Sequence, residues 1–169
     1  MFNLFFICSY QLTLILLFTL PILVALQFNA EPMSMIDWII AAVMLGFIVM
    51  ETIADQQQWD YQKEKRMAVE NKIELTDNLK KGFMDQGLWS FSRHPNYFAE
   101  QSIWVCFYLF SITASGQWFN WSIAGSLLLL VLFQGSSNFS EEISASKYSL
   151  YKEYQKKVPR FFGFSKSRS

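Results

Sequence analysis

The chain concentrates its apolar residues in long blocks, and the first block, residues 4–28, contains no charged side chain. A helix needs about 20 apolar residues to cross a hydrocarbon core of roughly 30 Å, so this block can span a bilayer with some tilt. Three further apolar blocks follow at about residues 36–54, 95–114 and 118–133. The blocks are too long for strands and lack period-2 alternation. The sequence therefore predicts an all-α integral membrane protein, a single membrane domain over residues 1–169 with about four transmembrane helices.

The basic residues indicate an orientation in the membrane. All 14 Lys and Arg residues lie in residues 63–93 or 147–168, and residues 1–54 contain none. A secretory signal peptide has a basic start, so the first block is predicted to be a retained membrane helix. Under the positive-inside rule, residues 55–95 and the C-terminal tail face the cytosol. The formal net charge is zero, so no overall basic field argues for a nucleic-acid partner.

The cytosolic segments have their own predicted structure. Residues 55–70 are rich in good helix formers and should extend the second helix beyond the membrane. Residues 82–87 have the composition of a turn and loop, and Pro95 suits the first turn of the third helix. Apolar residues recur at helical spacing over residues 143–158, with lysines between them, which predicts a C-terminal amphipathic helix on the membrane surface. The last residues, 165–169, are predicted to be disordered.

Polar residues gather at the predicted cytosolic ends of the spanning helices, where ionisable groups usually have a function. They form three clusters: Glu51 with Asp55; Arg93, His94, Asn96 and Glu100; and Asn138, Glu141 and Glu142. Since all three fall at one depth, they should converge on one polar pocket. Each cluster also has a structural explanation, such as a headgroup contact, a solvated turn or a hydrogen bond between helices. With two cysteines and one histidine, no structural zinc site is predicted.

The residue types of this pocket favour a nucleotide cofactor over other ligands. The sequence contains no Rossmann glycine motif, no P-loop and no Gly-x-Ser-x-Gly elbow. Cationic groups suit a phosphate-bearing ligand, and carboxylate and amide groups suit a nicotinamide, a ribose or an adenine. A lipophilic small-molecule substrate would enter sideways from the bilayer.

One string within the second cluster resembles a known signature. Residues 87–100 read Gly-Leu-Trp-Ser-Phe-Ser-Arg-His-Pro-Asn-Tyr-Phe-Ala-Glu. This resembles the motif of the steroid 5-alpha-reductase-like membrane enzymes, in the branch described as a domain of unknown function and related to the 3-oxo-5-alpha-steroid 4-dehydrogenase C-terminal domain. Glu-Thr-Ile-Ala-Asp-Gln-Gln at residues 51–57 and the tail from residue 139 to 154 resemble two further family segments. The resemblance covers about residues 3–163.

The resemblance implies NADPH-dependent reduction of a carbon–carbon double bond conjugated to a carbonyl. It also implies a dinucleotide pocket, for which the matched positions are Asp55, Arg93, Asn96, Glu100, Tyr148 and Tyr151, with Asn96 and Glu100 near the nicotinamide. Arg93 and nearby lysines would hold phosphates. The polar clusters add His94 and Glu142 to these candidate cofactor-binding residues. No catalytic residue is identified, because the chemistry comes from the cofactor.

The chain departs from the family pattern in two ways. Ala99 stands where a glycine is usual. Family members usually have further helices before the segment that matches Met1, and in the steroid reductases those helices carry the substrate-side carboxylate and tyrosine. Three explanations fit this difference: a truncated gene product, a minimal version of the enzyme, or half of a complex in which a partner supplies the missing helices.

Two other functions fit the sequence. The isoprenylcysteine methyltransferases, which use S-adenosylmethionine, resemble this region and share an Arg-His-Pro element. A non-catalytic fragment or interaction protein is the third possibility. A bacterial inner membrane and the endoplasmic reticulum both fit the predicted topology.

Overall fold

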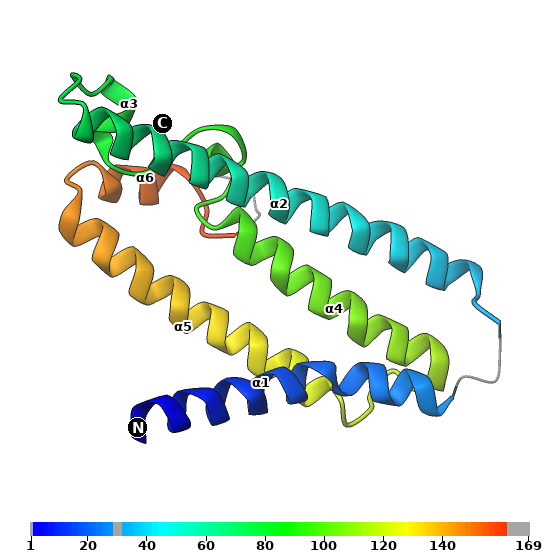
Figure 1. Ribbon diagram of the computed structural model, residues 1–169. Helices are drawn as coiled ribbons and strands as arrows, with labels where there is room; N and C mark the ends of the chain where they lie inside the picture. The colour runs from blue at the N-terminus through cyan, green and yellow to red at the C-terminus, as the bar shows by residue number, and fades with distance from the viewer. Residues whose placement is uncertain (1, 29–31, 162–169) are drawn as a thin grey trace. The chain divides into compact units, whose positions relative to one another are not determined.

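A computed structural model describes residues 2–28 and 32–161, with side chains from residue 8 onward (Figure 1). Within these residues the chain forms six α-helices and one 3-10 helix, and no strand. In chain order they are α1 (Phe2–Gln27), α2 (Met35–Glu70), α3 (Asp77–Lys81), η1 (Gly87–Ser90), α4 (Pro95–Ser115), α5 (Ile123–Lys147) and α6 (Tyr151–Lys157). The all-helical prediction is confirmed. The predicted disorder at residues 165–169 lies outside the described residues.

Three helices, α1, α2 and α5, are long and apolar enough to cross a membrane. In their most apolar windows, only 11%, 6% and 22% of the residues are buried inside the protein. A soluble helix buries its apolar stripe in a core, so apolar surfaces this exposed are those expected of helices surrounded by lipid. The predicted membrane character is therefore supported. The third predicted span corresponds to α4, a 21-residue helix that is not among the three, and its first turns carry Asn96, Glu100 and Gln101.

The chain divides into two compact units, and α2, α4 and α5 each continue from one unit into the other. The first unit comprises residues 1–47 and 101–134. Within it α1 and α5 approach closely, since a Cβ atom at Gly125 would lie 2.0 Å from the backbone oxygen of Leu17. Thr113 on α4 donates a 2.5 Å hydrogen bond to Asp37, which also accepts hydrogen bonds from Ser34 and so caps the start of α2.

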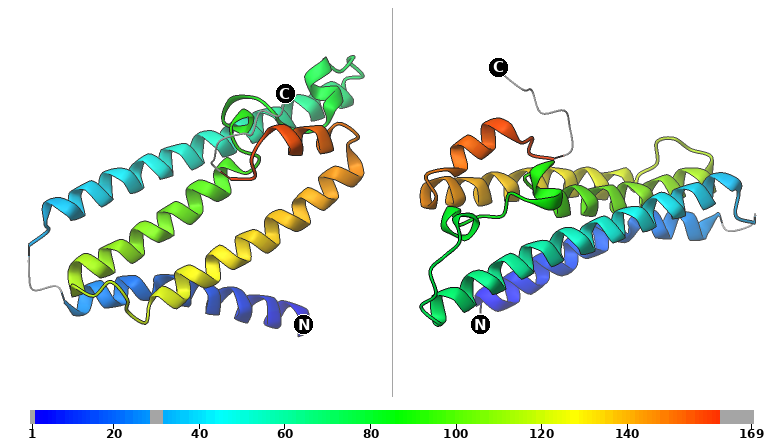
Figure 2. Two further views of the ribbon diagram at one scale, coloured as in Figure 1. Left: turned by 180° about the vertical axis from the view of Figure 1, so that it is seen from behind. Right: turned by 90° about the horizontal axis from the view of Figure 1, so that it is seen from above.

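The second unit, residues 48–100 and 135–169, holds the polar residues that the sequence singles out. Two small apolar clusters stabilise it. Tyr61, Ala68 and Leu79 form one, and Phe83, Tyr151 and Tyr154 form the other. Both further views show α6 beside the segment that leads into α4 (Figure 2). Two backbone hydrogen bonds join them, from Arg93 N to the oxygen of Pro159 and from His94 N to that of Arg160.

The helix boundaries confirm some predictions and correct others. α2 runs without a break to Glu70, as expected from its helix formers, and α4 begins at Pro95. The fourth helix was predicted to end near residue 133, which is wrong, because α5 continues to Lys147. The predicted amphipathic helix over residues 143–158 is therefore shorter. Only α6 remains of it, and its tyrosines pack against Phe83 inside the protein while its lysines lie outward.

Candidate functional site

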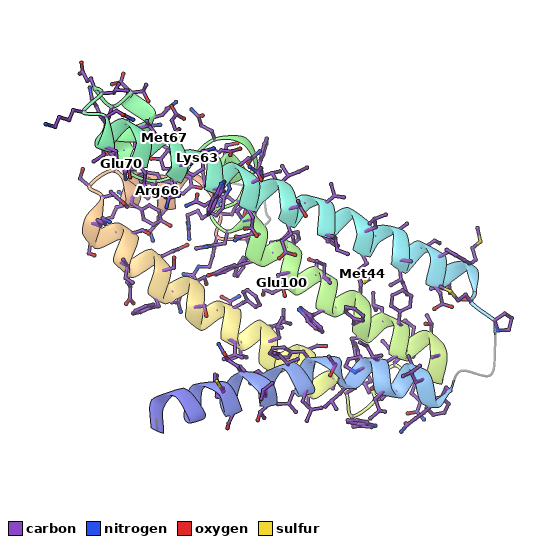
Figure 3. All side chains as sticks on the ribbon, in the orientation of Figure 1. Met44, Lys63, Arg66, Met67, Glu70 and Glu100 are labelled. Carbon is purple, nitrogen blue, oxygen red and sulfur yellow. The ribbon has the colours of Figure 1, made fainter. Side chains whose placement is uncertain are left out.

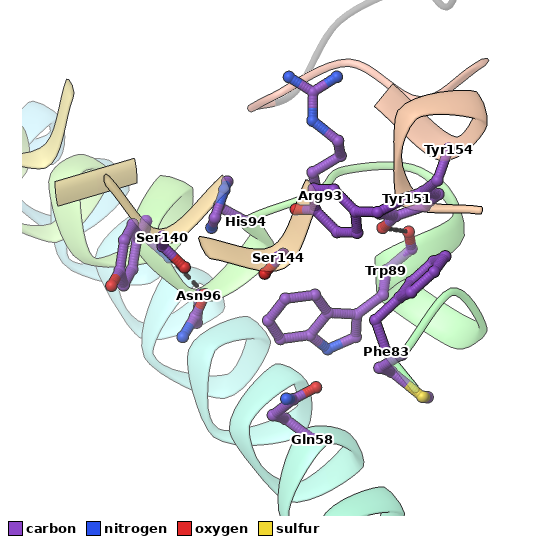
Figure 4. Close-up of a pocket in the computed structure, with 12 residues that line it drawn as sticks. Gln58, Phe83, Trp89, Arg93, His94, Asn96, Ser140, Ser144, Tyr151 and Tyr154 are labelled. Carbon is purple, nitrogen blue, oxygen red and sulfur yellow. Dashed lines mark hydrogen bonds between the residues drawn. The ribbon is translucent and has the colours of Figure 1, made fainter. Parts of the chain in front are cut away.

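A pocket of about 240 Å³ lies in the second unit (Figure 4). Its wall combines aromatic rings with polar side chains, and includes Gln58, Trp89, Arg93, His94, Asn96 and Tyr151. Ser140 and Ser144 add two hydroxyl groups from α5. A concave site with a few polar groups among aromatic ones is the usual form of a small-molecule site.

Beside this pocket, Arg93 and Glu141 form a buried ion pair. Arg93 Nε lies 2.8 Å from Glu141 Oε1, and Arg93 Nη2 lies 3.1 Å from Glu141 Oε2. The two side chains are only 9% and 5% exposed. This bidentate arrangement is the strong form of an arginine–carboxylate contact. It joins the segment before α4 to the C-terminal half of α5.

Arg93 also holds the end of α6. Its Nη1 donates 2.7 Å hydrogen bonds to the backbone oxygens of Gln155 and Val158. A guanidinium has five N–H donors. Four of those of Arg93 make hydrogen bonds within the chain. The family resemblance implies phosphate binding by Arg93 and nearby lysines. The structure instead places Arg93 in the framework of the pocket wall, with little capacity left for a phosphate.

His94 is held in one orientation by the same carboxylate. Its Nε2 lies 3.1 Å from Glu141 Oε1, and its ring stacks on Tyr97 at a centroid distance of 5.2 Å. An ionised carboxylate only accepts hydrogen bonds, so this contact requires a proton on Nε2. In neutral His94, Nδ1 is then the acceptor nitrogen. Gln155 Nε2 completes the cluster with a 2.9 Å hydrogen bond to Glu141 Oε2.

A second polar group joins the two predicted motifs. Asn96 Nδ2 donates a 2.9 Å hydrogen bond to Asp55 Oδ1, which links the start of α4 to α2. Glu51 lies one turn before Asp55 on α2, and Glu100 lies one turn after Asn96 on α4. The carboxyl groups of Glu51 and Glu100 are within hydrogen-bonding reach of each other. Two of the three clusters predicted to converge therefore do meet, although their members lie 41 residues apart in the sequence.

Trp89 and Gly87 fix η1 against α2. The indole Nε1 of Trp89 donates a 3.1 Å hydrogen bond to the backbone oxygen of Ala54, and the backbone N of Leu88 donates one of 3.0 Å to Gln57. Gly87 has φ +59°, and a Cβ atom there would lie 2.6 Å from the Gln57 amide. Glycine is therefore needed at this turn for both conformation and space.

The tyrosines of the tail take different places. Tyr151 and Tyr154 are buried and line the pocket, and the hydroxyl of Tyr154 donates to the backbone oxygen of Trp89. Burial raises the pKa of Tyr151 to about 12, and it raises that of Tyr154 further. Tyr148 packs instead against Gly82, where Lys65 lies 5.1 Å from its ring centroid. Both buried phenols are therefore neutral hydrogen-bonding groups at physiological pH.

An open groove of about 510 Å³ runs along the polar extension of α2. It is lined by Asp55, Gln58, Trp59, Gln62 and Arg66, which lie along one side of the helix. The Arg66 guanidinium lies 5.6 Å from the Trp59 ring centroid. Figure 3 marks Arg66 and Lys63 on this part of α2. The groove and the pocket share Gln58, so they meet at that side chain.

All eight candidate residues lie in the second unit, but they do not form one ring around a ligand. Those that line the pocket are Arg93, His94, Asn96 and Tyr151, and Asp55 lines the groove. Glu100 faces Glu51, and Tyr148 packs at Gly82. Glu142 is exposed and lines none of the pockets described, while its neighbour Glu141 makes the buried contacts.

The sequence analysis left out several residues that build the site. Gln58 follows Asp55 by three positions and so lies on the same helix face, which is a signal that helical spacing could have given. Trp89 belongs to the Gly-Leu-Trp motif but carried no expected role. Tyr154 belonged to the apolar spacing of the predicted tail helix but was not among the candidate binding residues. Arg66 had no distinguishing local pattern, and only the groove reveals it.

Comparison with known proteins places the chain in a family. A protein family described as "Protein of unknown function (DUF1295)" matches residues 1–158. The chain belongs to the DUF1295 family. The match includes both motifs that meet at Asp55 and Asn96, so the contact between them joins two segments of the family region.

A curated relative of this DUF1295 protein is the uncharacterized protein C594.04c of Schizosaccharomyces pombe. The two are 40% identical over 170 residues, which is 96% of this chain and 49% of the relative. The chain thus spans about half the length of the curated relative it matches. No solved structure matched the chain.

Proposed function

We propose that the protein is a membrane-embedded, NAD(P)H-dependent reductase of a conjugated carbon–carbon double bond in a lipid or steroid-like enone. The observation that carries this proposal is the 2.9 Å hydrogen bond between Asn96 and Asp55. It joins the two segments whose resemblance to the steroid 5-alpha-reductase-like enzymes implies dinucleotide binding, and it does so where the pocket and the groove adjoin.

The residues around the two cavities fit the parts of a dinucleotide. A long, narrow ligand can extend from the pocket into the groove past Gln58, which lines both. Aromatic faces at Trp89 and Trp59 offer stacking surfaces for planar rings, and Asp55 offers an acceptor for ribose hydroxyls. Because Arg93 is bound to Glu141, the phosphate-binding role passes in this proposal to Arg66, which is exposed on the groove.

The chemistry would come from the cofactor. NADPH, when bound, supplies a hydride for the β-carbon of the enone, and the α-carbon takes a proton. The protein would bind and orient the two partners, and the neutral hydroxyl of Tyr151 and the side chains of Asn96 and His94 would donate or accept hydrogen bonds at the pocket. Groups that polarise the substrate carbonyl are expected from a partner or from segments beyond those described.

We further propose that the site faces the cytosol. The exposed lysines of α6 and the basic part of α2 flank it, and the positive-inside rule puts such segments on the cytosolic side. A lipophilic substrate would then reach the pocket from the bilayer, while the water-soluble cofactor would enter from the cytosol.

Calorimetric titration of the detergent-purified protein with NADPH, NADH and S-adenosylmethionine tests the proposal. Asn96→Ala and Asp55→Ala should both weaken NADPH binding, because these residues line the pocket and the groove and bond to each other. Glu64→Ala, an exposed change on α2 outside the pockets described, is the matched control and should bind like the unmodified protein. A bound ligand also raises the melting temperature by mass action, which gives a second readout.

The outcomes separate the functions that fit the sequence. NADPH binding that both variants lose supports the reductase, and a screen of enone substrates then follows. Binding of S-adenosylmethionine alone would replace the proposal with a methyltransferase. If a well-folded sample binds none of the three at millimolar concentration, the proposed function fails for this chain alone, and the search turns to a partner that completes the site.

A further inference from the structure

One buried polar atom of the pocket has no partner within the described residues: Gln58 Oε1. Its two neighbours in the sequence, Gln56 and Gln57, both form side-chain hydrogen bonds. Gln56 Nε2 donates a 2.9 Å hydrogen bond to Asp60, and Gln57 Oε1 accepts one of 3.0 Å from the backbone N of Leu88. A buried acceptor without a donor is costly, and native proteins leave few of them. Because Gln58 lines both the pocket and the groove, a ligand bound there could supply the missing donor.

The surroundings of Gln58 strengthen this reading. Figure 4 shows its side chain on α2 near Trp89. The single N–H donor of Trp89 is already bound to the backbone oxygen of Ala54, and the hydroxyl of Tyr154 donates to Trp89 O. These aromatic neighbours in the pocket wall therefore use their donors elsewhere. Since Gln58 lines both the pocket and the groove, a ligand extending through them would pass its amide.

We infer that Gln58 is a specificity-determining residue whose Oε1 accepts a hydrogen bond from an amino group on a planar heterocycle of the bound dinucleotide. This inference rests on the proposed function. A dinucleotide carries two such groups, the carboxamide N–H₂ of the nicotinamide and the 6-amino group of the adenine. Both present an N–H donor in the plane of a ring or close to it, so either could supply the donor that Gln58 Oε1 lacks.

Two cofactor analogues tell these sources apart. In the acetylpyridine analogue of NADP⁺ a methyl group replaces the amide nitrogen, and in the hypoxanthine analogue an oxygen replaces the 6-amino group. Dissociation constants of NADP⁺ and both analogues are measured for the unmodified protein, for Gln58→Met and for Gln56→Met. Methionine keeps the length of the side chain without its amide, and Gln56, exposed and outside the pockets described, is the matched control.

We expect one analogue to bind the unmodified protein about three- to tenfold more weakly than NADP⁺, the size of one net hydrogen bond. Gln58→Met should weaken NADP⁺ by a similar factor and abolish the difference between NADP⁺ and that analogue. Gln56→Met should preserve the difference. Because the substitution removes an unsatisfied buried acceptor, Gln58→Met should melt no lower than the unmodified protein, so loss of folding would not explain the result.

Three results would overturn the inference. Equal binding of NADP⁺ and both analogues by the unmodified protein would show that neither amino group is read. If the difference in dissociation constant between NADP⁺ and the analogue persists in Gln58→Met, another residue recognises the amino group. If NADP⁺ binds and Asn96→Ala abolishes that binding while Gln58→Met changes nothing, the proposed function stands and this inference falls, whereas absence of any NADP⁺ binding overturns both.

Discussion

Replacing Glu141 with alanine should strongly destabilise the protein. The substitution removes four hydrogen bonds, two from Arg93 and one each from His94 and Gln155. It also leaves the Arg93 guanidinium, whose side chain is 9% exposed, without its counter-ion. Breaking a buried ion pair by removing one partner costs about 3–5 kcal/mol, because the remaining charge stays buried.

The expected change is measurable as a melting temperature. For a chain of this size each kcal/mol shifts the midpoint by about 2–4 °C, so Glu141→Ala should melt about 6–20 °C lower. Thermal unfolding in detergent, followed by circular dichroism, is the assay. Glu142→Ala is the matched control: the same substitution one position along α5, at an exposed side chain, should change the free energy of unfolding by no more than about 0.5 kcal/mol.

The reasoning about Glu141 would be refuted if its alanine variant melted within about 2 °C of the Glu142 variant. A double variant gives a second check. Arg93→Met combined with Glu141→Leu replaces both charges by apolar groups, so its cost should be well below the sum of the two single changes. A cost equal to that sum would mean that the two side chains act independently.

Gly82→Ala should lower the free energy of unfolding by about 1–3 kcal/mol more than Gly116→Ala. Both glycines have positive φ, but only at Gly82 would the added Cβ lie 2.1 Å from a tyrosine ring. Chemical unfolding of the two variants in one detergent measures the difference. Trp89→Phe should cost about 1–2 kcal/mol, because it removes the indole hydrogen bond to the Ala54 oxygen and part of a buried ring; chemical unfolding followed by circular dichroism measures the cost. Burial raises the pKa of Tyr151 from 10.0 to about 12, so the folded state holds this proton more tightly than the unfolded state. Its contribution to stability is complete below pH 10 and should be lost as pH rises from about 10 to 12, with a shallower loss in Tyr151→Phe, as melting temperatures across that range would show.

Much of the helical architecture could be predicted from local sequence. The extension of α2 to Glu70 contains good helix formers and neither proline nor glycine after Gly46, so nothing in the sequence interrupts it. Pro95 begins α4 because its missing N–H costs nothing in the first turn of a helix. The end of α5 was harder to predict. Gly135 and the serines after it have the composition of a helix end, yet the helix continues for another three turns.

The site could be predicted only in part, because its contacts depend on which helix face points inward. Adjacent residues of a helix point about 100° apart, so Glu141 and Glu142 look alike in sequence although one is buried and the other is exposed. The sequence predicted that the clusters containing Asp55 and Asn96 converge on one pocket, but it did not predict that these two side chains pair. The hydrogen bonds of Arg93 to backbone oxygens at the end of α6 were not predicted. No local pattern shows which hydrogen-bond acceptors a distant segment places beside a side chain.

The contacts of Arg93 also set an order for biosynthesis. Glu141 follows Arg93 by 48 residues, and the backbone oxygens of Gln155 and Val158 follow it by 62 and 65. At about 5–20 residues per second, the ribosome makes the arginine roughly 2–10 s before its carboxylate. The guanidinium must therefore stay hydrated or paired with lipid headgroups while α4 and α5 are inserted. The wall of the pocket is thus among the last parts of the chain to assemble, whatever the order in which its helices enter the membrane.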